Sequence, residues 1–539
     1  MRLWTERPMK VGPILLAAAA LLALLLALPG QTVTTRYLND LFVILDGAYR
    51  VAAGQVPNQD FHTPLGPFAY YLTAAGYFLS GTLGGTMPTA MALITLVLAL
   101  PMAHILGSRL HPLLAVLYGL FLLLILAVPV NLGESVTSLS FAKFYNRIGW
   151  AALGALLVMY LQPLSARRRQ TLLDTACAAA LTLLMLYTKL SYGVVALAFL
   201  LFMLLDRQQR RWSASALGIT ILAVLVIELI WQSSLAHLAD LRLAFDVGGS
   251  GLRGTWGQII DHVLVNLTDY VLLGLFAGIA LYRTHSVRDL LFYAFCAIAG
   301  FLIVNQNFQA WGIIMLHGAA AVAAETILRS EDHRPQAVDH GSWSTGAGAK
   351  LLFLAVVLPT IIHCLAALGL HTAAASVKAG NAVPLPNLEQ VRVANLWTWS
   401  DYDTAAAYQD SLRDGFDALS NLDPKPDRIF VLDTGNPFSM ALGAPPARGD
   451  TPWLQWDRTL GRANHVPAEA LLADVQFVMV PKTADTSDAA IGPLPQLQAI
   501  YGHYIAAHFD AAGETQHWTL YRRRPPPAPE AALQQDGRS

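Results

Sequence analysis

Long apolar runs separated by short polar stretches dominate the first 370 positions of the chain. A helix of roughly 17–25 apolar residues crosses a hydrocarbon core of about 30 Å, and these runs have that length. We therefore predict about eleven transmembrane helices, near residues 11–29, 87–107, 112–130, 148–163, 171–188, 190–205, 213–232, 264–282, 289–304, 310–328 and 350–370. The pattern is typical of a polytopic α-helical membrane protein with a transmembrane domain at 1–370.

The pattern changes after residue 370, where Pro, Asp, Asn and Trp occur in the proportions of a soluble domain. Short runs of β-forming residues recur there, at 428–433, 475–481 and 517–523. A helical pattern at 401–420 lies between the polar segments. We expect a small α/β domain at 371–524, followed by a proline-rich tail at 525–539 that is predicted to be disordered.

The distribution of arginines between the apolar runs indicates the orientation of the chain. A cytoplasmic N-terminus places Arg-rich segments such as SARRRQ and DRQQRR inside, as the positive-inside rule requires. The first apolar run is too long for a signal peptide, so we expect it to persist as the first helix. This topology requires 64–83 not to cross, and we predict a re-entrant or interfacial helix there. The first loop, 30–86, and the C-terminal domain then lie outside a bacterial-type cytoplasmic (inner) membrane.

Composition narrows the class of protein further. The chain is 55% hydrophobic and only 13% charged, against about 25% charged residues in soluble domains. The net charge of −1 says nothing about partners, and no basic stripe indicates nucleic acid as a partner. The three cysteines fall inside apolar runs, so neither a disulfide framework nor a zinc-type spacing is predicted. No cofactor is predicted, although a divalent metal is left open.

Ionisable residues gather directly after the first apolar run, in YLNDLFVILDGAYRVAAGQVPNQDFHTPLGP. Residues 38–53 have the apolar spacing of an amphipathic helix, with Asn39 as its predicted N-cap. Asp40 then lies in the first turn, where backbone N–H groups favour a carboxylate. Asp46 and Arg50 are four positions apart and are predicted to form an ion pair on this helix.

The order of these features resembles the GT-C glycosyltransferases, a family that includes protein O-mannosyltransferases and aminoarabinose transferases. In that family an acidic residue follows the first span, and a G-x-x-x-x-D-like turn and a Pro-rich aromatic segment come after it. Here Asp40 is followed by GQVPNQDF and PLGPFAYYL. The resemblance covers about residues 11–370 and assigns the essential carboxylate to Asp40 rather than Asp46. The chain has Asn39 and Asp40 where many relatives have paired acids.

The resemblance implies a GT-C-like fold and an inverting transfer of a sugar from a polyprenyl-phosphate donor, with Asp40 as general base. The acceptor would be a lipid, glycan or polymer of the cell envelope. A departing phosphate needs cationic and hydrogen-bonding groups on the outer face. The candidate substrate-binding residues there are Asp60, His62, Lys143, Tyr145, Asn146, Arg147, Lys189 and Arg253. For Asp60 and His62, a turn is the alternative to substrate contact.

Two other functions fit parts of the pattern. A transporter or flippase for a lipid-linked substrate would need polar residues within spans and broken helices, and the sequence shows few of either. A non-catalytic envelope scaffold would use the first loop only to dock the C-terminal domain. Aromatic residues that could stack on a sugar or form the core of that domain are Trp397, Trp399, Trp453 and Trp456. The partners expected are the donor lipid, the acceptor and membrane lipids.

Overall fold

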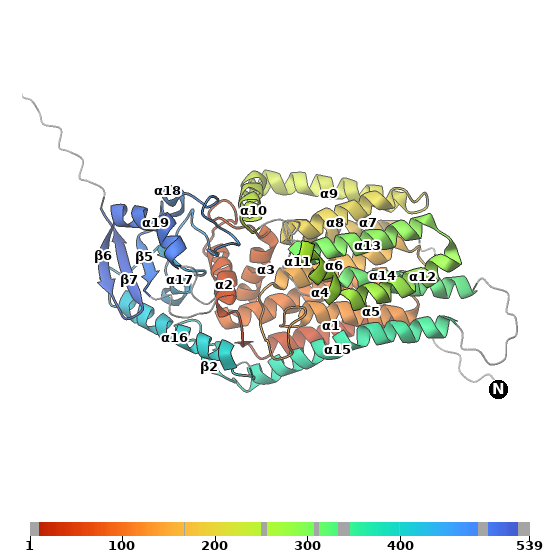
Figure 1. The fold of residues 1–539 in the computed structure, drawn as a ribbon, viewed down its shortest axis with the longest axis horizontal. Coiled ribbons are helices and arrows are strands. Elements are labelled where there is room, and N and C mark those ends of the chain that lie inside the picture. Colours follow the sequence, from red (N-terminus) through yellow and green to blue (C-terminus); the bar gives the residue numbers. More distant parts are fainter. Residues whose placement is uncertain are drawn as a thin grey trace, which may run out of the picture.

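The computed structural model describes residues 10–165, 168–248, 256–306, 312–332, 345–397, 399–482 and 494–525. Long helices run side by side along one axis, and an α/β part lies at one end of them (Figure 1). The bundle contains α1 (Val11–Ala27), α4 (Leu83–Arg109), α5 (Pro112–Ala127), α6 (Phe144–Leu157), α7 (Gln170–Thr188), α8 (Leu190–Met203), α9 (Arg210–Trp231), α12 (Leu267–Thr284), α13 (Val287–Gln306), α14 (Ile314–Asp332) and α15 (Thr345–Ser376). A helix lies at each predicted span.

Several of these helices have the length and composition to cross a bilayer. Among the described residues, five helices meet both criteria individually, namely α4, α7, α9, α13 and most of α15. A sixth would be the pair formed by α11 (Trp256–Val265) and α12, which is bent by 65°. Helices α1, α5 and α8 are apolar but shorter. This arrangement fits a polytopic membrane protein, and the number of eleven spans stays a prediction.

The outer helices expose many apolar side chains, and the contact of so large an apolar surface with water would be unfavourable. On α9, Leu225, Leu229 and Ile230 are 59%, 76% and 80% exposed. Helix α6, by contrast, is buried along its whole length. A surface of this kind is stable against lipid tails.

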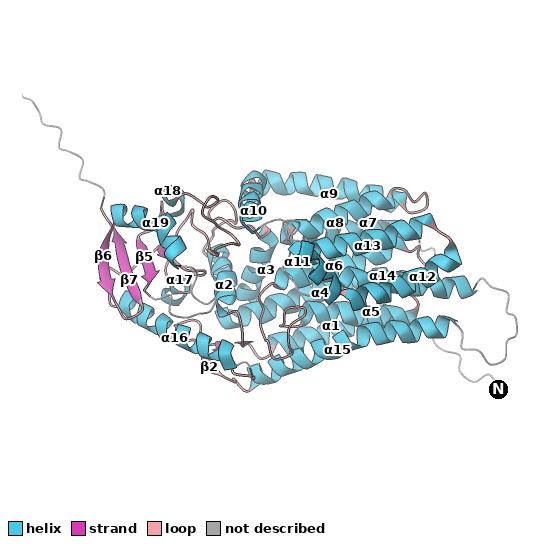
Figure 2. Ribbon diagram, viewed as in Figure 1, coloured by secondary structure: helices cyan, strands magenta, loops and turns pink. Residues whose placement is uncertain are grey.

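A layer of shorter helices separates the bundle from the α/β part (Figure 2). It contains α2 (Leu38–Ala52), α3 (Pro67–Ser80) and α10 (Ser234–Gly248). Helix α2 confirms the predicted helix at 38–53. Helix α3 packs against α4 and is about 21 Å long at 1.5 Å per residue, shorter than a hydrocarbon core. That 64–83 does not cross the membrane stays a prediction.

The predicted cap of α2 is wrong. The N-cap is Tyr37, in the left-handed conformation at φ 58°, and Asn39 lies inside the helix. The Tyr37 hydroxyl donates to Glu134 Oε1 at 2.8 Å, and the Leu41 amide donates to the Tyr37 carbonyl. These two bonds start the helix ahead of Asn39. Asp40 nevertheless lies in the first turn, as predicted.

The α/β part is built on a four-stranded sheet of order β4-β5-β7-β6. Its strands are β4 (Ile429–Val431), β5 (Phe477–Pro481), β6 (Phe509–Glu514) and β7 (Trp518–Arg523), and its helices are α16 (Trp399–Ser420), α17 (Phe438–Leu442), α18 (Ala468–Leu471) and α19 (Leu494–His508). Strands β4 and β5 are parallel, and the other two pairings are antiparallel. The three predicted strands and the predicted helix are confirmed; β6 was not predicted.

A second, three-stranded sheet ties the first loop to the segment after the last bundle helix. Strand β1 (Thr32–Thr34) pairs in parallel with β3 (Val391–Val393), and β2 (Asn381–Ala382) pairs with β3 on its other side. Helix α15 continues past the predicted boundary at residue 370 to Ser376. The division into domains stays a prediction, and of the predicted tail only Pro525 is among the described residues.

Gly66 sets how closely the first loop approaches the end of α7. A Cβ at this position would lie 2.0 Å from the Tyr187 carbonyl oxygen, and the Gly66 amide donates to the Thr188 carbonyl at 3.2 Å. We expect Gly66→Ala to lower the free energy of unfolding by at least about 1–3 kcal/mol, because backbone must move to admit the methyl group. Thermal unfolding in nanodiscs measures this effect.

Gly278 provides the matched control, because a Cβ there meets nothing within 4 Å. Since alanine is the better helix former, Gly278→Ala should leave stability unchanged or raise it by up to about 1 kcal/mol. Equal melting temperatures for the two variants would show that the contact between Gly66 and α7 is not tight.

Candidate active site

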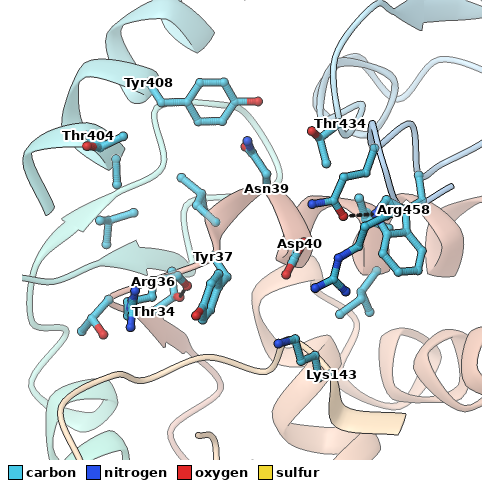
Figure 3. A pocket seen from close by; sticks show the side chains of 18 of the residues that line it. Thr34, Arg36, Tyr37, Asn39, Asp40, Lys143, Thr404, Tyr408, Thr434 and Arg458 are labelled. Carbon is cyan, nitrogen blue, oxygen red and sulfur yellow. Dashed lines mark hydrogen bonds between the residues drawn. The ribbon is translucent and has the colours of Figure 1, made fainter. Parts of the chain in front are cut away.

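A cavity of about 280 Å³ lies where α2, the loop before α6 and the α/β part meet (Figure 3). Its lining includes Asp40, Lys143, Tyr145, Tyr408, Thr434 and Arg458. Asp40 and Tyr145 come from the ends of helices at the edge of the bundle, whereas the last three residues come from the α/β part. Segments more than 400 positions apart thus form one site.

Asp40 is held at the N-terminal end of α2 and is partly exposed to the cavity. Burial raises the pKa of its carboxyl group above the ordinary value, while the positive charges of Arg458 and Lys143 act in the opposite direction. A carboxylate in this setting is more basic than one in water, yet the neighbouring cations favour its ionised form. This combination suits a general base.

Two lysines approach this end of the bundle from separate loops. Lys143 precedes α6 in the left-handed conformation and lines the cavity. Lys189 lies between α7 and α8, where its Nζ donates to Asn146 Oδ1 at 3.2 Å and lies 5.2 Å from the centre of the Tyr145 ring. Burial, with the charges of Arg458 and Lys143, lowers the pKa of Lys189 to about 7. Lys189 therefore contacts Tyr145 and Asn146 next to the cavity but does not line it.

The wall supplied by the α/β part is neutral apart from Arg458. Tyr408, Thr434 and Gln455 offer hydroxyl and amide groups, and Trp453 adds an aromatic ring. Hydroxyl, amide and aromatic groups suit a carbohydrate. Of the other tryptophans, Trp397 is 76% exposed, Trp456 packs against the core around the sheet, and the side chain of Trp399 is outside the described residues.

The structure brings together only part of the predicted substrate-binding set. Lys143, Tyr145, Asn146 and Lys189 lie in or directly behind the cavity wall. Arg147 does not line the cavity: it is 1% exposed and donates to the Val130 carbonyl at 3.0 Å. Arg147 directly follows Asn146 on α6. Because successive helical residues point about 100° apart, the side chain of Arg147 is directed into the bundle.

Asp60 and His62 lie outside the cavity and hold neighbouring segments in place. Asp60 accepts a bond from the Val56 amide at 2.8 Å and pairs with Arg448 at 2.7 Å. His62 Nδ1 lies 2.7 Å from Asp240 Oδ1 on α10. The turn that was the alternative for Asp60 is thus present. Arg253, the last predicted residue, lies outside the described residues.

The predicted pair of Asp46 and Arg50 is confirmed at 3.0 Å, and it has a third member. Arg50 also donates to both carboxylate oxygens of Asp450 in the α/β part, with Nη2 3.0 Å from Oδ2. All three side chains are buried, with exposures of 0–1%. This buried cluster joins the first-loop helix to the α/β part.

The charged residues that were missed at the sequence level are Arg36 and Arg458 of the cavity lining and Asp450 of the buried cluster. Asp450 and Arg458 lie in a polar segment, TPWLQWDRTLGR and its surroundings, that has no recognisable motif. The spacing of residues along the sequence does not predict a contact between residues that lie 400 positions apart. Within the described residues, no group of three or more His, Cys, Asp or Glu side chains is arranged to hold a metal ion.

Comparison with known proteins gives matches among solved structures alone. No family model matches the chain, and no curated protein is significantly similar to it in sequence. The crystal structure of ArnT from Cupriavidus metallidurans in the apo state is 14% identical, with a TM-score of 0.47 over 94% of this chain and 97% of that one. ArnT bound to undecaprenyl phosphate is 14% identical, with a TM-score of 0.44 over the same shares.

The Archaeoglobus fulgidus oligosaccharyltransferase, in complex with Zn and sulfate, is also 14% identical. Its TM-score is 0.44, over 93% of this chain and 72% of that one. These matches are similarities of fold alone. TM-scores below 0.5 carry no mechanistic detail, so residue roles must come from the geometry of the cavity.

Proposed function

We propose that this protein is a membrane glycosyltransferase that moves a sugar from a polyprenyl-phosphate donor to a hydroxyl group of a cell-envelope lipid, glycan or polymer. One observation carries the proposal: Asp40 faces Lys143 and Arg458 across a single cavity at the end of an apolar helix bundle. A base and cations on one cavity match the two requirements of such a transfer, a proton acceptor and a site for phosphate.

The reaction is a single displacement at the anomeric carbon. The acceptor oxygen forms a bond to that carbon while the bond from the carbon to the phosphate oxygen breaks, and its electron pair leaves with the polyprenyl phosphate. Asp40 takes the proton of the acceptor hydroxyl. Attack opposite the leaving phosphate inverts the anomeric centre. The phosphate needs no proton, because Lys143 and the neighbouring positive charges stabilise it.

The position of the cavity suits a donor that cannot leave the bilayer. Helix α2, which carries Asp40, begins at Leu38, shortly after α1 ends at Ala27. The cavity is lined by α2, the loop before α6 and the α/β part, and the α/β part lies at one end of the helix bundle (Figure 1). A phosphate on a membrane-embedded chain would therefore reach the cations without extraction of its tail, while the neutral side chains of the α/β wall would face the acceptor.

A transfer assay tests the proposal. The purified protein in nanodiscs is given a panel of polyprenyl-phosphate-linked hexoses and pentoses together with extracted envelope acceptors. We expect release of polyprenyl phosphate coupled to incorporation of sugar into one acceptor, with inverted configuration. Movement of intact donor between leaflets of proteoliposomes, without cleavage of the sugar–phosphate bond, would instead identify a flippase. No effect on either process would favour a scaffold.

A further inference from the structure

We propose that Arg458, which belongs to the α/β part, is a ligand of the donor phosphate, so that the site is complete only when this part is docked on the first-loop helix. The inference rests on the proposed function and assigns a residue that the first-loop motif does not contain. The observations that carry it are the direction of the Arg458 side chain, the rigidity of its turn, the anchoring of that turn and the charge of the cavity.

The guanidinium of Arg458 points into the cavity, toward Asp40 and on the same side as Lys143 (Figure 3). Its charge acts on the carboxyl group of Asp40, on the ammonium groups of Lys143 and Lys189, and on the Tyr145 hydroxyl. Arg458 is therefore within electrostatic reach of the charged and phenolic groups that α2 and the loops next to α6 and α8 supply to the site.

The turn that carries Arg458 is fixed by its own hydrogen bonds. The Arg458 and Thr459 amides donate to the Gln455 carbonyl at 3.2 and 2.8 Å. Thr459 Oγ1 accepts from the Gln455 amide and donates to the Trp453 carbonyl, both at 2.9 Å. Trp453 Nε1 donates to Gln455 Oε1 at 2.9 Å. A side chain on such a turn is positioned before a ligand arrives, which lowers the entropic cost of binding.

The same segment is anchored to the first loop a few residues upstream. Asp450 accepts from Arg50 of α2, and its carbonyl accepts from the His62 amide at 2.8 Å. The Gly449 amide donates to the Asp60 carbonyl at 2.6 Å. These contacts fix the distance between α2, which carries Asp40, and the turn that carries Arg458.

The charge of the cavity favours an anion. Three cationic side chains line it, Arg36, Lys143 and Arg458, against one carboxylate, Asp40. A cavity lined by more cationic than anionic side chains attracts an anion. A guanidinium offers a planar pair of donors that fits two phosphate oxygens, whereas the lysines act as point charges. Arg458 is thus suited to hold a phosphate group that departs from the anomeric carbon.

The test measures binding in the absence of transfer. The probe is a polyprenyl monophosphate without a sugar, titrated onto the full-length protein in nanodiscs of zwitterionic lipid. We expect Arg458→Ala to raise Kd by about 10- to 100-fold, the effect of losing a charge-assisted hydrogen bond to a charged group. Arg458→Lys should give a smaller increase, because it keeps the charge and loses the second donor.

The control is Arg462→Ala, four positions further along on an exposed part of the same segment and outside the cavity lining. It should bind the probe like the wild type. If Arg458→Ala loses the fold by thermal unfolding, Arg458→Gln, closer in volume, decides the question by the same titration. Wild-type affinity in a folded Arg458 variant with slowed transfer would overturn the inference, since Arg458 would then act on Asp40 alone.

A different experimental result would contradict the proposed function itself. A wild-type protein that neither binds the polyprenyl monophosphate nor cleaves any sugar–phosphate donor would overturn both the glycosyltransferase and the role of Arg458. Binding and transfer by the wild type, with binding unchanged in the folded Arg458 variants, would overturn the role of Arg458 alone.

Discussion

Replacing Asp40 by Asn is expected to slow sugar transfer by about 10²- to 10⁴-fold, the range for loss of a general base. The amide has almost the same shape but cannot take the proton of the acceptor hydroxyl. Affinity for the donor should stay within a few-fold of the wild type or increase, because the cavity keeps its cations and loses its lining carboxylate. Turnover and donor Kd, measured separately in nanodiscs, give the two values.

The pH dependence adds a second readout for Asp40. Since burial raises the pKa of this carboxyl group, wild-type turnover should fall as the pH is lowered through that raised value. The residual activity of Asp40→Asn should lack this fall. Asp46→Asn, which alters another carboxylate of the same helix, is the matched control and should retain transfer. An Asp40→Asn protein with normal turnover would show that another group accepts the proton.

Replacing Arg50 by Ala is expected to produce the largest loss of stability, about 3–5 kcal/mol. Arg50 is fully buried and is bonded to both Asp46 and Asp450, so its removal leaves two buried carboxylates without their shared cation. We also expect loss of transfer, because the anchor of the segment that carries Arg458 is gone. Thermal unfolding and hydrogen exchange of residues 447–460 report the two effects.

Asp46→Asn is the control for Arg50→Ala. It distinguishes the effect of losing the Arg50 cation from the effect of any change in the buried cluster. Burial is the main reason that the pKa of Asp46 is raised to about 6. An acid with a raised folded-state pKa loses stabilisation as the pH rises through that value, so ionised Asp46 costs stability above about pH 6. Asp46→Asn should therefore equal or exceed the wild type at pH 8, with a smaller difference at pH 5. If Arg50→Ala unfolded like the wild type, the cluster would not hold the α/β part.

Features governed by local pattern could be predicted from the sequence. The apolar runs predicted where bundle helices lie, and amphipathic spacing predicted α2 to within one residue at its end. The i,i+4 spacing predicted the pair of Asp46 and Arg50. Strand β6 was not predicted because its FDAAGE sequence has low β propensity. The strand forms by pairing along β7.

Features governed by tertiary contact could not be predicted. Asn39 is a good capping residue, yet the bond between Tyr37 and Glu134 starts the helix earlier. Arg147 follows Asn146 in the chain, but its side chain is buried in the bundle. Asp450 and Arg458 lie in a segment without a motif, and only the folded arrangement reveals their proximity to α2. The resemblance of the first-loop motif thus pointed to Asp40, which lines the cavity, and gave no indication of Arg458 from the α/β part.

The parallel pairing of β1 with β3 has a consequence for how the protein is made. Thr32 pairs with Val391, so the first strand is synthesised 359 positions before its partner. At about 5–20 residues per second, the ribosome delivers that partner roughly 20–70 seconds later. During this interval the first loop has an unpaired strand edge. The cavity can form only after Arg458 has been synthesised, so a nascent chain that stalls before this residue lacks the complete candidate site.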